Sequence, residues 1–335
     1  MISAGIIGVG AGIPDGVLTN ADLEKMVETS DEWIRTRSGI RERRIAPPEM
    51  AASDLALIAA REALADAGIT PAELDLVIVA TITSDMVFPS TSCLVQHALG
   101  AEKAAAYDLS AGCSGFIYGL AQAAQSIATG FCRYVLVVGV DLLSRVTDWT
   151  DRSTCVLFGD GAGAAVLGPV EEGKGFLAHY LGSDGGGAEH LFMPAGGSRR
   201  PADHATVANR MHYIKMNGNE VFKFAVRIMP EAAEEVLRRA GLGKDEIDLF
   251  LPHQANIRII ESAAKRLGIP MERVYVNVDR YGNTSAASIP ICLAELHRAG
   301  RLRPGDHLLL VGFGAGLTWG ASVLIWTKES GGSQS

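Results

Sequence analysis

Two stretches of this chain, AGITPAELDLVIVA at 67–80 and AGLGKDEIDLFLPH at 240–253, decide its fold because they resemble one another. Each begins with Ala-Gly at the end of an amphipathic segment, continues through an acidic residue, an apolar residue and Asp-Leu, and enters a short apolar run. A glycine in that place favours a left-handed helix C-cap, and the apolar run is typical of a buried strand. The stretches lie 173 residues apart, so they predict one helix–strand unit that occurs twice.

Two further matches keep nearly the same offset. YVLVVGVD at 134–141 resembles HLLLVGFG at 307–314, and Gly112-Cys113-Ser114 lies 170 residues before Gly282-Asn283-Thr284. The glycine-rich strands FGDGAGAAVLG at 158–168 and GFGAGLTWGASVLIW at 312–326 are expected to close the two copies. Three matches in one order favour a duplicated α/β unit, although any two strand–helix units share some likeness.

The chain of 335 residues has room for two such units, because a domain has typically about 150 residues. We therefore predict an α/β fold of two duplicated layered halves related by a pseudo-twofold axis, over 1–172 and 173–328, with a disordered tail over 329–335. The apolar periodicity predicts buried strands at 74–81, 134–140 and 307–313, and helices at 51–68 and 219–241.

The composition excludes several classes of protein. Hydrophobic residues make up 48% and charged residues 20%, which is typical of a globular chain, and the net charge of -8 provides no basic field for nucleic acid or an anionic membrane. The N-terminus lacks a basic signal region, and no apolar run has the length of a membrane helix. The five cysteines have no metal-ligand spacing, so we expect a cytoplasmic protein without metal.

Cys113 is the strongest candidate nucleophile. It lies in DLSAGCSGF, where an apolar strand passes through a turn of small residues into a helical stretch that runs to Gly130. The free N–H groups and the dipole of a helix N-terminus stabilise a thiolate, so this position predicts a reactive cysteine. The other four cysteines lie in apolar segments, where a free cysteine usually serves as a small core residue.

His253 and Asn283 are expected near Cys113. His253 follows the strand DLFLP at the carboxyl edge of its sheet, where active sites of α/β proteins gather, and Asn283 occupies the second copy's equivalent of the Cys113 position. Each residue alone also has a structural explanation, as a strand-end histidine or a Gly-Asn turn. A pseudo-twofold axis would bring all three together, and the loop GFGAG at 312–316 would offer backbone N–H groups to an oxyanion.

These residues lie in motifs that, over nearly the whole chain, resemble the β-ketoacyl-acyl-carrier-protein synthase III family, the condensing enzymes that begin type II fatty-acid synthesis. The motifs are IIGVGAGIP, SDEWIRTRSGIRERRIA, AGCSGF, FGDGAGA, KMNGNEVFKFAV, PHQANIRII, DRYGNTSAAS and GFGAGLTWG. The resemblance implies the thiolase fold with two duplicated halves, in agreement with the repeat. The family loop often has three consecutive glycines, and this chain has Ala315 in the middle position, which keeps the backbone donor.

The resemblance also implies a mechanism and partners. Cys113 would take an acyl group, acetyl being the expected starter, from an acyl-CoA, while backbone N–H groups of Cys113 and Ala315 hold the oxyanion. Neutral His253 and Asn283 would donate hydrogen bonds to the enolate formed when malonyl-acyl-carrier protein loses carbon dioxide. The product would be a 3-oxoacyl-carrier protein. The enzyme would be a homodimer and would need no cofactor.

The remaining site residues follow from the same resemblance. The CoA site is expected at Trp33, Arg37, Arg152, Gly218 and Asn219, and the acyl pocket at Phe88 from the partner subunit, Phe158 and Phe222. The dock for the acidic carrier protein is expected at Gln254, Ala255, Asn256, Ile257, Arg258, Lys265, Arg266 and Lys223. Charged runs are also found as plain solvated faces, and aromatic residues as plain core.

Other functions share part of this signature. A papain-type hydrolase also has Cys, His and Asn in this order, but its cysteine-rich flank is missing here. A non-catalytic CoA-binding or nucleotide-binding module would not need the three polar residues, and an elongating condensing enzyme has a second histidine in place of Asn283. A related enzyme that uses another starter in secondary metabolism stays open, because one or two pocket side chains decide the starter.

Overall fold

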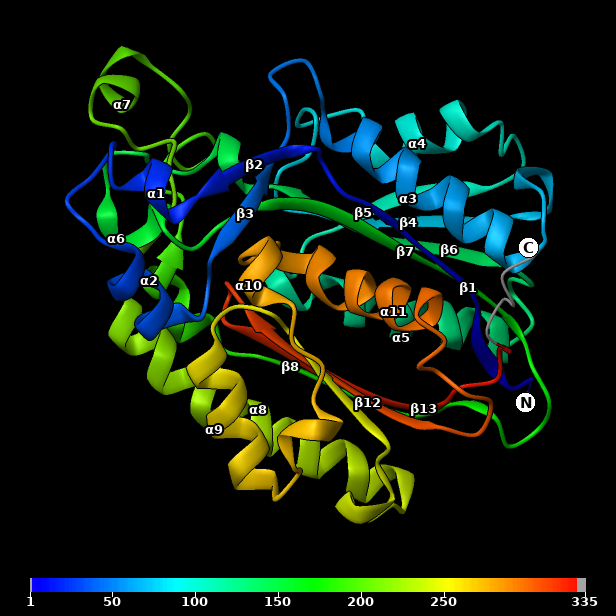
Figure 1. Ribbon diagram of the computed structural model, residues 1–335. Coiled ribbons are helices and arrows are strands. Elements are labelled where there is room, and N and C mark those ends of the chain that lie inside the picture. Colours follow the sequence, from blue (N-terminus) through cyan, green and yellow to red (C-terminus); the bar gives the residue numbers. More distant parts are fainter. Residues whose placement is uncertain (1, 330–335) are drawn as a thin grey trace.

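In the computed structural model, which describes residues 2–329, two sheets lie between three layers of helices (Figure 1). One helix pair covers the outer face of each sheet, and a third pair fills the layer between the sheets. The outer pairs are α3 (Ala52–Ala67) with α4 (Thr91–Leu99) and α8 (Gly218–Ala240) with α9 (Ile257–Leu267), and the inner pair is α5 (Gly115–Ala128) with α11 (Ser288–Arg298). The predicted α/β class is confirmed. The predicted tail lies outside the described residues except for Glu329.

The two sheets have the same arrangement of strands. The first sheet consists, in spatial order, of β1 (Ala4–Gly12), β7 (Asp160–Pro169), β6 (Val135–Leu142), β4 (Leu76–Ala80) and β5 (Ala105–Leu109). The second consists of β8 (Gly175–Ser183), β13 (Thr318–Ile325), β12 (His307–Gly314) and β11 (Leu249–Pro252). β4 pairs parallel with β6 as β11 does with β12, and β6 pairs antiparallel with β7 as β12 does with β13.

The duplication extends to the elements beside the sheets. A single parallel bridge between Phe250 and Val274 lies next to β11, where the first sheet has β5. Each inner helix follows a short 3₁₀ turn, Gly112–Ser114 before α5 and Ser285–Ala287 before α11. The fold is therefore two copies of one α/β unit, as the sequence repeat predicts. The boundary at 172/173 stays a prediction, which the strand membership of the two sheets supports.

The smaller elements form loops and flaps around this frame. β2 and β3 pair as a two-stranded antiparallel sheet with α1 and α2 between them in the chain, and β9 and β10 pair within the long segment between β8 and α8. These elements are β2 (Gly16–Thr19), α1 (Asn20–Leu23), α2 (Asp31–Ser38), β3 (Glu42–Ile45), α6 (Arg152–Cys155), β9 (Leu191–Phe192), α7 (His204–Ala208), β10 (Lys215–Met216) and α10 (Val278–Tyr281). None of the helices within residues 2–329 has the length and apolar character of a membrane span.

Most of the predicted elements are confirmed, with one correction. Gly68 and Gly241 end α3 and α8 in the left-handed conformation, as expected from their missing side chains. The segment 312–326 is not one strand. β12 ends at Gly314 and β13 begins at Thr318, and the residues between them turn the chain in an antiparallel hairpin. The GFGAG motif therefore lies at a hairpin turn, where its backbone is free to face a ligand.

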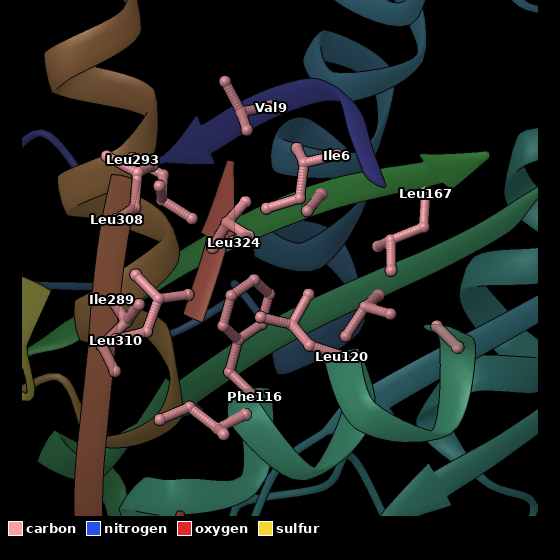
Figure 2. Close-up of a cluster of buried hydrophobic side chains, with 14 of the residues drawn as sticks. Ile6, Val9, Phe116, Leu120, Leu167, Ile289, Leu293, Leu308, Leu310 and Leu324 are labelled. Carbon is pink, nitrogen blue, oxygen red and sulfur yellow. The ribbon is translucent and has the colours of Figure 1, made fainter. Parts of the chain in front are cut away.

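A large hydrophobic cluster contains residues of both halves. Leu120 from α5 and Leu293 from α11 belong to one buried cluster with residues of both sheets (Figure 2). The further labelled members are Ile6, Val9, Phe116, Leu167, Ile289, Leu308, Leu310 and Leu324. Because the inner helices bury side chains against both sheets, the halves are packed as one body, and a site between them has a rigid frame.

Two glycines set how closely the halves approach. A side chain at Gly139 of β6 would overlap the carbonyl group of Ala286, and a side chain at Gly314 of β12 would overlap the backbone of Cys113. Each half thus has a bare strand position against which the helix start of the other half lies. This reciprocal contact brings the residues before α5 and those before α11 to one place.

Candidate active site

Cys113, His253 and Asn283 line one pocket between the two halves. Cys113 lies in the turn before α5, Asn283 lies just before the turn that opens α11, and His253 follows β11. The pocket is mainly apolar, with Phe158, Phe222 and other hydrophobic side chains around the three polar groups. The structure thus brings together the three residues that the sequence repeat places at equivalent helix starts and a strand end.

Burial dominates the chemistry of Cys113. Cys113 is buried, with 8% of its surface exposed, and this burial raises the pKa of the thiol to about 12, with the buried carboxyl group of Asp141 adding to the rise and Ser285 opposing it. The sequence analysis expected the helix start to stabilise a thiolate. The position is as predicted, but in the free protein the cost of desolvating the charge exceeds the favourable field of the helix. The resting form at neutral pH is therefore the thiol.

His253 is held by one ring nitrogen and presents the other. Its Nδ1 lies 2.7 Å from the hydroxyl of Ser288, and its ring meets Phe313 edge-on at 5.4 Å between centroids. Burial lowers the pKa of the imidazole to about 3, so the ring is neutral at physiological pH. Its buried Nε2 has no hydrogen-bond partner among the described residues, which leaves this atom for a ligand in the pocket.

Backbone contacts fix Asn283 across the two halves. Its N–H donates to the carbonyl of Leu157 at 2.8 Å, and its own carbonyl accepts from Gly159 at 3.0 Å. The side-chain Oδ1 accepts from the N–H of Ser285 at 2.9 Å. A backbone N–H can only donate, so this contact identifies the oxygen of the amide. The NH₂ group is consequently the free end of the side chain.

A second cavity adjoins Cys113 on the side of the GFGAG turn. Gly112, Ser285 and Ala315 line it together with apolar side chains. A side chain at Gly112 would overlap the backbone of Ala315, so the backbone of Ala315 lies directly beside the turn that contains Cys113. Its further lining residues are Ile82, Leu143, Val146, Phe158, Leu191, Phe192, Met193 and Ile214.

The three predicted acyl-pocket residues lie in different places. Phe158 lines both cavities, whereas Phe222 lines only the first, where the guanidinium of Arg258 stacks over its ring at 5.3 Å. Phe88 lines neither cavity of its own chain and is 83% exposed. Of the three predicted acyl-pocket residues, then, Phe158 alone borders the second cavity within one chain.

Most of the predicted CoA residues do not line the first pocket. Gly218, at the start of α8, lines the pocket, but Asn219 is exposed and does not. Trp33 and Arg152 face one another, with the guanidinium 4.7 Å from the ring centroid. Arg37 is exposed, and its carbonyl accepts a hydrogen bond from the side chain of Asn256 at 2.9 Å. An adenine could enter between Trp33 and Arg152 only after this stack opens.

Most of the predicted dock residues are at the surface, and one is not. Arg258, Lys265 and Arg266 on α9 and Lys223 on α8 are exposed, while Ala255 and Asn256 line the first pocket and Ile257 is half-buried. The prediction is wrong for Gln254. Its side chain is buried and is used in four internal hydrogen bonds, so it has no free group for a partner.

The sequence analysis did not identify Ser288 and Phe313. Ser288 stands in the apolar helix SIPICLAEL, and a polar residue in a buried helix face needs a hydrogen-bond partner. A polar residue at this position of an apolar helix is the signal by which the sequence could have identified Ser288. Phe313 is an ordinary strand residue in the sequence, and only the fold shows that it packs on His253. Within residues 2–329, no group of three or more His, Cys, Asp or Glu side chains is arranged to hold a metal ion.

The comparisons with known proteins agree along the whole chain. Residues 107–185 match the family model for 3-oxoacyl-[acyl-carrier-protein] synthase III, and residues 237–326 match the model for its C-terminal part. The β-ketoacyl-[acyl-carrier-protein] synthase III of Symbiobacterium thermophilum is 62% identical over 97% of this chain and 98% of its own length. This chain belongs to the 3-oxoacyl-[acyl-carrier-protein] synthase III family.

Other members of the family are similarly close. The synthase III of Caldanaerobacter subterraneus subsp. tengcongensis is 60% identical over 98% of this chain and 99% of its own length. The crystal structure of the enzyme from Aquifex aeolicus VF5 has a TM-score of 0.89 at 50% identity and covers 96% of this chain and all of its own. The fold is thus the thiolase-like fold of the condensing enzymes.

The raised pKa of Cys113 predicts how its alkylation depends on pH. The thiolate fraction should rise about tenfold with each unit between about pH 7 and pH 10, because the pKa lies near 12. Iodoacetamide modification of the Cys113 peptide, measured by mass spectrometry, should therefore increase without a plateau. The peptide of exposed Cys93 serves as the internal comparison. A plateau for Cys113 near pH 9 would contradict the dominance of burial.

Proposed function

We propose that this protein catalyses the initiating condensation of type II fatty-acid synthesis, in which an acyl-CoA and malonyl-acyl-carrier protein give 3-oxoacyl-carrier protein, carbon dioxide and CoA. One observation carries the proposal: a buried thiol and two uncharged side chains with a free polar end line the same pocket, in a chain of this family. Acetyl-CoA is the expected starter. The hydrolase and secondary-metabolism alternatives are not favoured at this level of identity.

The first step transfers the acyl group to Cys113. The sulfur attacks the thioester carbon of the acyl-CoA, and the carbonyl oxygen takes negative charge that backbone N–H groups of Cys113 and Ala315 stabilise. When the carbonyl re-forms, the bond to the CoA sulfur breaks, and the proton lost by the Cys113 thiol ends on that sulfur. Because the resting group is a thiol, the proton must leave as the sulfur attacks.

The second step forms the carbon–carbon bond. The carboxylate of the malonyl group leaves as carbon dioxide, and its bonding electrons pass into an enolate whose oxygen accepts hydrogen bonds from His253 Nε2 and the Asn283 NH₂. The enolate carbon attacks the acyl carbon on Cys113, and the bond to sulfur breaks. Cys113 departs as a thiolate and takes a proton from solvent. The low pKa of the imidazole supports His253 as a neutral hydrogen-bond donor. A base is not required in this step, because no proton on carbon has to be removed.

Different surfaces of the protein would bind the two substrates. Trp33, Arg152 and Arg37 would hold the nucleotide end of CoA, and Gly218 with Asn219 would border its pantetheine arm. The carrier protein would dock on α9 and α8, where Arg258, Lys265 and Arg266 are exposed without an acidic partner among the described residues. No cofactor is needed for these steps, and the cytoplasm is the expected location, as five free thiols suggest.

We also infer a homodimer. β5 is an edge strand of the first sheet and carries exposed Tyr107, and the segment before α4 exposes Met86, Val87 and Phe88. Pairing of two copies along β5 would cover this edge and bring Phe88 to the pocket of the other subunit. Phe88 would then complete the acyl pocket, to which it does not belong within one chain.

Sedimentation equilibrium tests the homodimer. The mass should be about twice the 35.4 kDa of one chain. Tyr107→Glu should shift the mass toward the monomer by placing charge on the edge strand, whereas Phe131→Glu, which changes an exposed aromatic residue elsewhere, should leave it unchanged. A monomer at micromolar concentration, or equal effects of both variants, contradicts the inference.

The two half-reactions test the proposed roles of the three residues. Cys113→Ala should abolish transfer of radiolabelled acetyl from CoA to the protein. His253→Ala and Asn283→Ala should retain this self-acylation, while malonyl-carrier-protein decarboxylation falls by about 10²–10³-fold, the usual loss for one donor to a developing oxyanion. Labelling that persists without Cys113, or equal loss of both steps in the other variants, means that the roles are wrong.

The carrier-protein dock is tested best at Lys265. Arg258 stacks on Phe222 in the pocket, so its replacement would also disturb CoA binding. Lys265→Glu should raise the KM for malonyl-carrier protein by about 3–10-fold and leave the KM for acyl-CoA unchanged, and added salt should shrink the difference. Lys174→Glu, on the loop between β7 and β8, is the matched control. A parallel rise in both KM values excludes the dock.

A further inference from the structure

We propose that Ser288 is a positioning residue for the condensation step: its hydroxyl donates to Nδ1 of His253 and so keeps the single ring proton on Nε2, the atom offered to the substrate. The proposal deepens the proposed function, because it rests on His253 acting as a hydrogen-bond donor. It assigns a role to a residue that neither touches the pocket nor carries charge.

The contact is short and closed to water. Ser288 is the first residue of α11, its hydroxyl lies 2.7 Å from Nδ1, and both side chains are almost fully buried. His253 is meanwhile tethered through its backbone N–H to Val311 at 2.8 Å. Because the imidazole is neutral, it carries one proton, and the partner of Nδ1 decides on which nitrogen that proton resides.

The balance of donors and acceptors selects one tautomer. If Nδ1–H donated to the serine oxygen, the serine O–H would itself need an acceptor, and the described residues provide none for it beyond His253. If the hydroxyl donates to Nδ1, one hydrogen bond satisfies both buried groups. The proton then resides on Nε2. The opposite tautomer would present a lone pair to the enolate oxygen and repel it.

The turn before α11 orients the second hydrogen-bond donor, the side-chain NH₂ group of Asn283. The N–H of Ser285 binds Asn283 Oδ1 and leaves the NH₂ group free, as Ser288 leaves Nε2–H free on His253. Ser285 has a φ of 52°, in the left-handed region that is unfavourable for a residue other than glycine. The turn therefore retains a conformation that lowers its own stability, and the orientation of the two donors is the function that this conformation serves.

The chain also contains a matched control. His179 on β8 is half-buried, and its Nδ1 lies 2.8 Å from the hydroxyl of Ser322 on β13, which is fully buried. Burial lowers the pKa of this imidazole to about 4. His179 does not line the pocket. Ser322→Ala therefore removes the same kind of serine–histidine contact from the same half of the fold without touching the proposed site.

The experiment combines spectroscopy with the two half-reactions. In protein labelled with ¹⁵N in the histidine rings, and with His253 assigned by a His253→Gln variant, the unliganded protein at neutral pH should show a protonated Nε2 and a bare Nδ1. Ser288→Ala should broaden or shift this signature and reduce malonyl decarboxylation about tenfold, the size expected from losing one hydrogen bond between neutral groups. Self-acylation of Cys113 should stay within about twofold of the parent rate.

Two comparisons separate positioning from a loss of stability. Ser322→Ala should lower the thermal midpoint about as much as Ser288→Ala and leave both half-reactions unchanged. In a His253→Ala background, Ser288→Ala should cause no further loss, because it acts through the imidazole. Protonated Nδ1 in the parent protein, or a Ser288→Ala variant that decarboxylates at the parent rate, overturns the proposal. Absence of acylation and decarboxylation in the parent would instead overturn the proposed function, while the tautomer measurement still stands.

Discussion

The close approach of each half to the other at Gly139 and Gly314 is the constraint on which the site depends. With no side chain at either position, the turn before α11 lies against β6 and the turn before α5 lies against β12. The pseudo-twofold axis passes between these turns, so Cys113 and Asn283 meet although the sequence separates them by 170 residues. The hydrophobic core that α5 and α11 share keeps Cys113 and Asn283 at a fixed separation in space.

Burial then determines the kind of chemistry that the site supports. It keeps the thiol of Cys113 protonated and the imidazole of His253 uncharged, so the pocket contains donors and a neutral nucleophile in place of ion pairs. Charges lie outside, on α8 and α9. A neutral, mainly apolar pocket strengthens each hydrogen bond to a developing oxyanion, while the charged surface of α8 and α9 is the part proposed to dock the carrier protein.

The repeat in the sequence was sufficient to predict the duplicated halves and the convergence of Cys113, His253 and Asn283, because helix starts at equivalent positions are related by symmetry. It could not predict the protonation of Cys113, since a helix start predicts a lowered pKa and only the packed structure shows the burial that raises it. Gln254 was misplaced for a similar reason. The sequence places Gln254 between pocket residues, and only the packed structure shows that its side chain is buried and bonded to the backbone of Pro252 and Asn277.

In the proposed CoA site, the stack of Arg152 on Trp33 would compete with the adenine of CoA for the face of the indole. The guanidinium is tethered beside the indole and is therefore present at a high effective concentration, which a free nucleotide has to outcompete. Part of the stacking energy gained with adenine would be offset by the Arg152–Trp33 contact that it displaces, which would weaken binding of the nucleotide end. In the proposed cycle, this competition would favour release of CoA after acyl transfer and so free the pocket between the two halves for the carrier protein's arm.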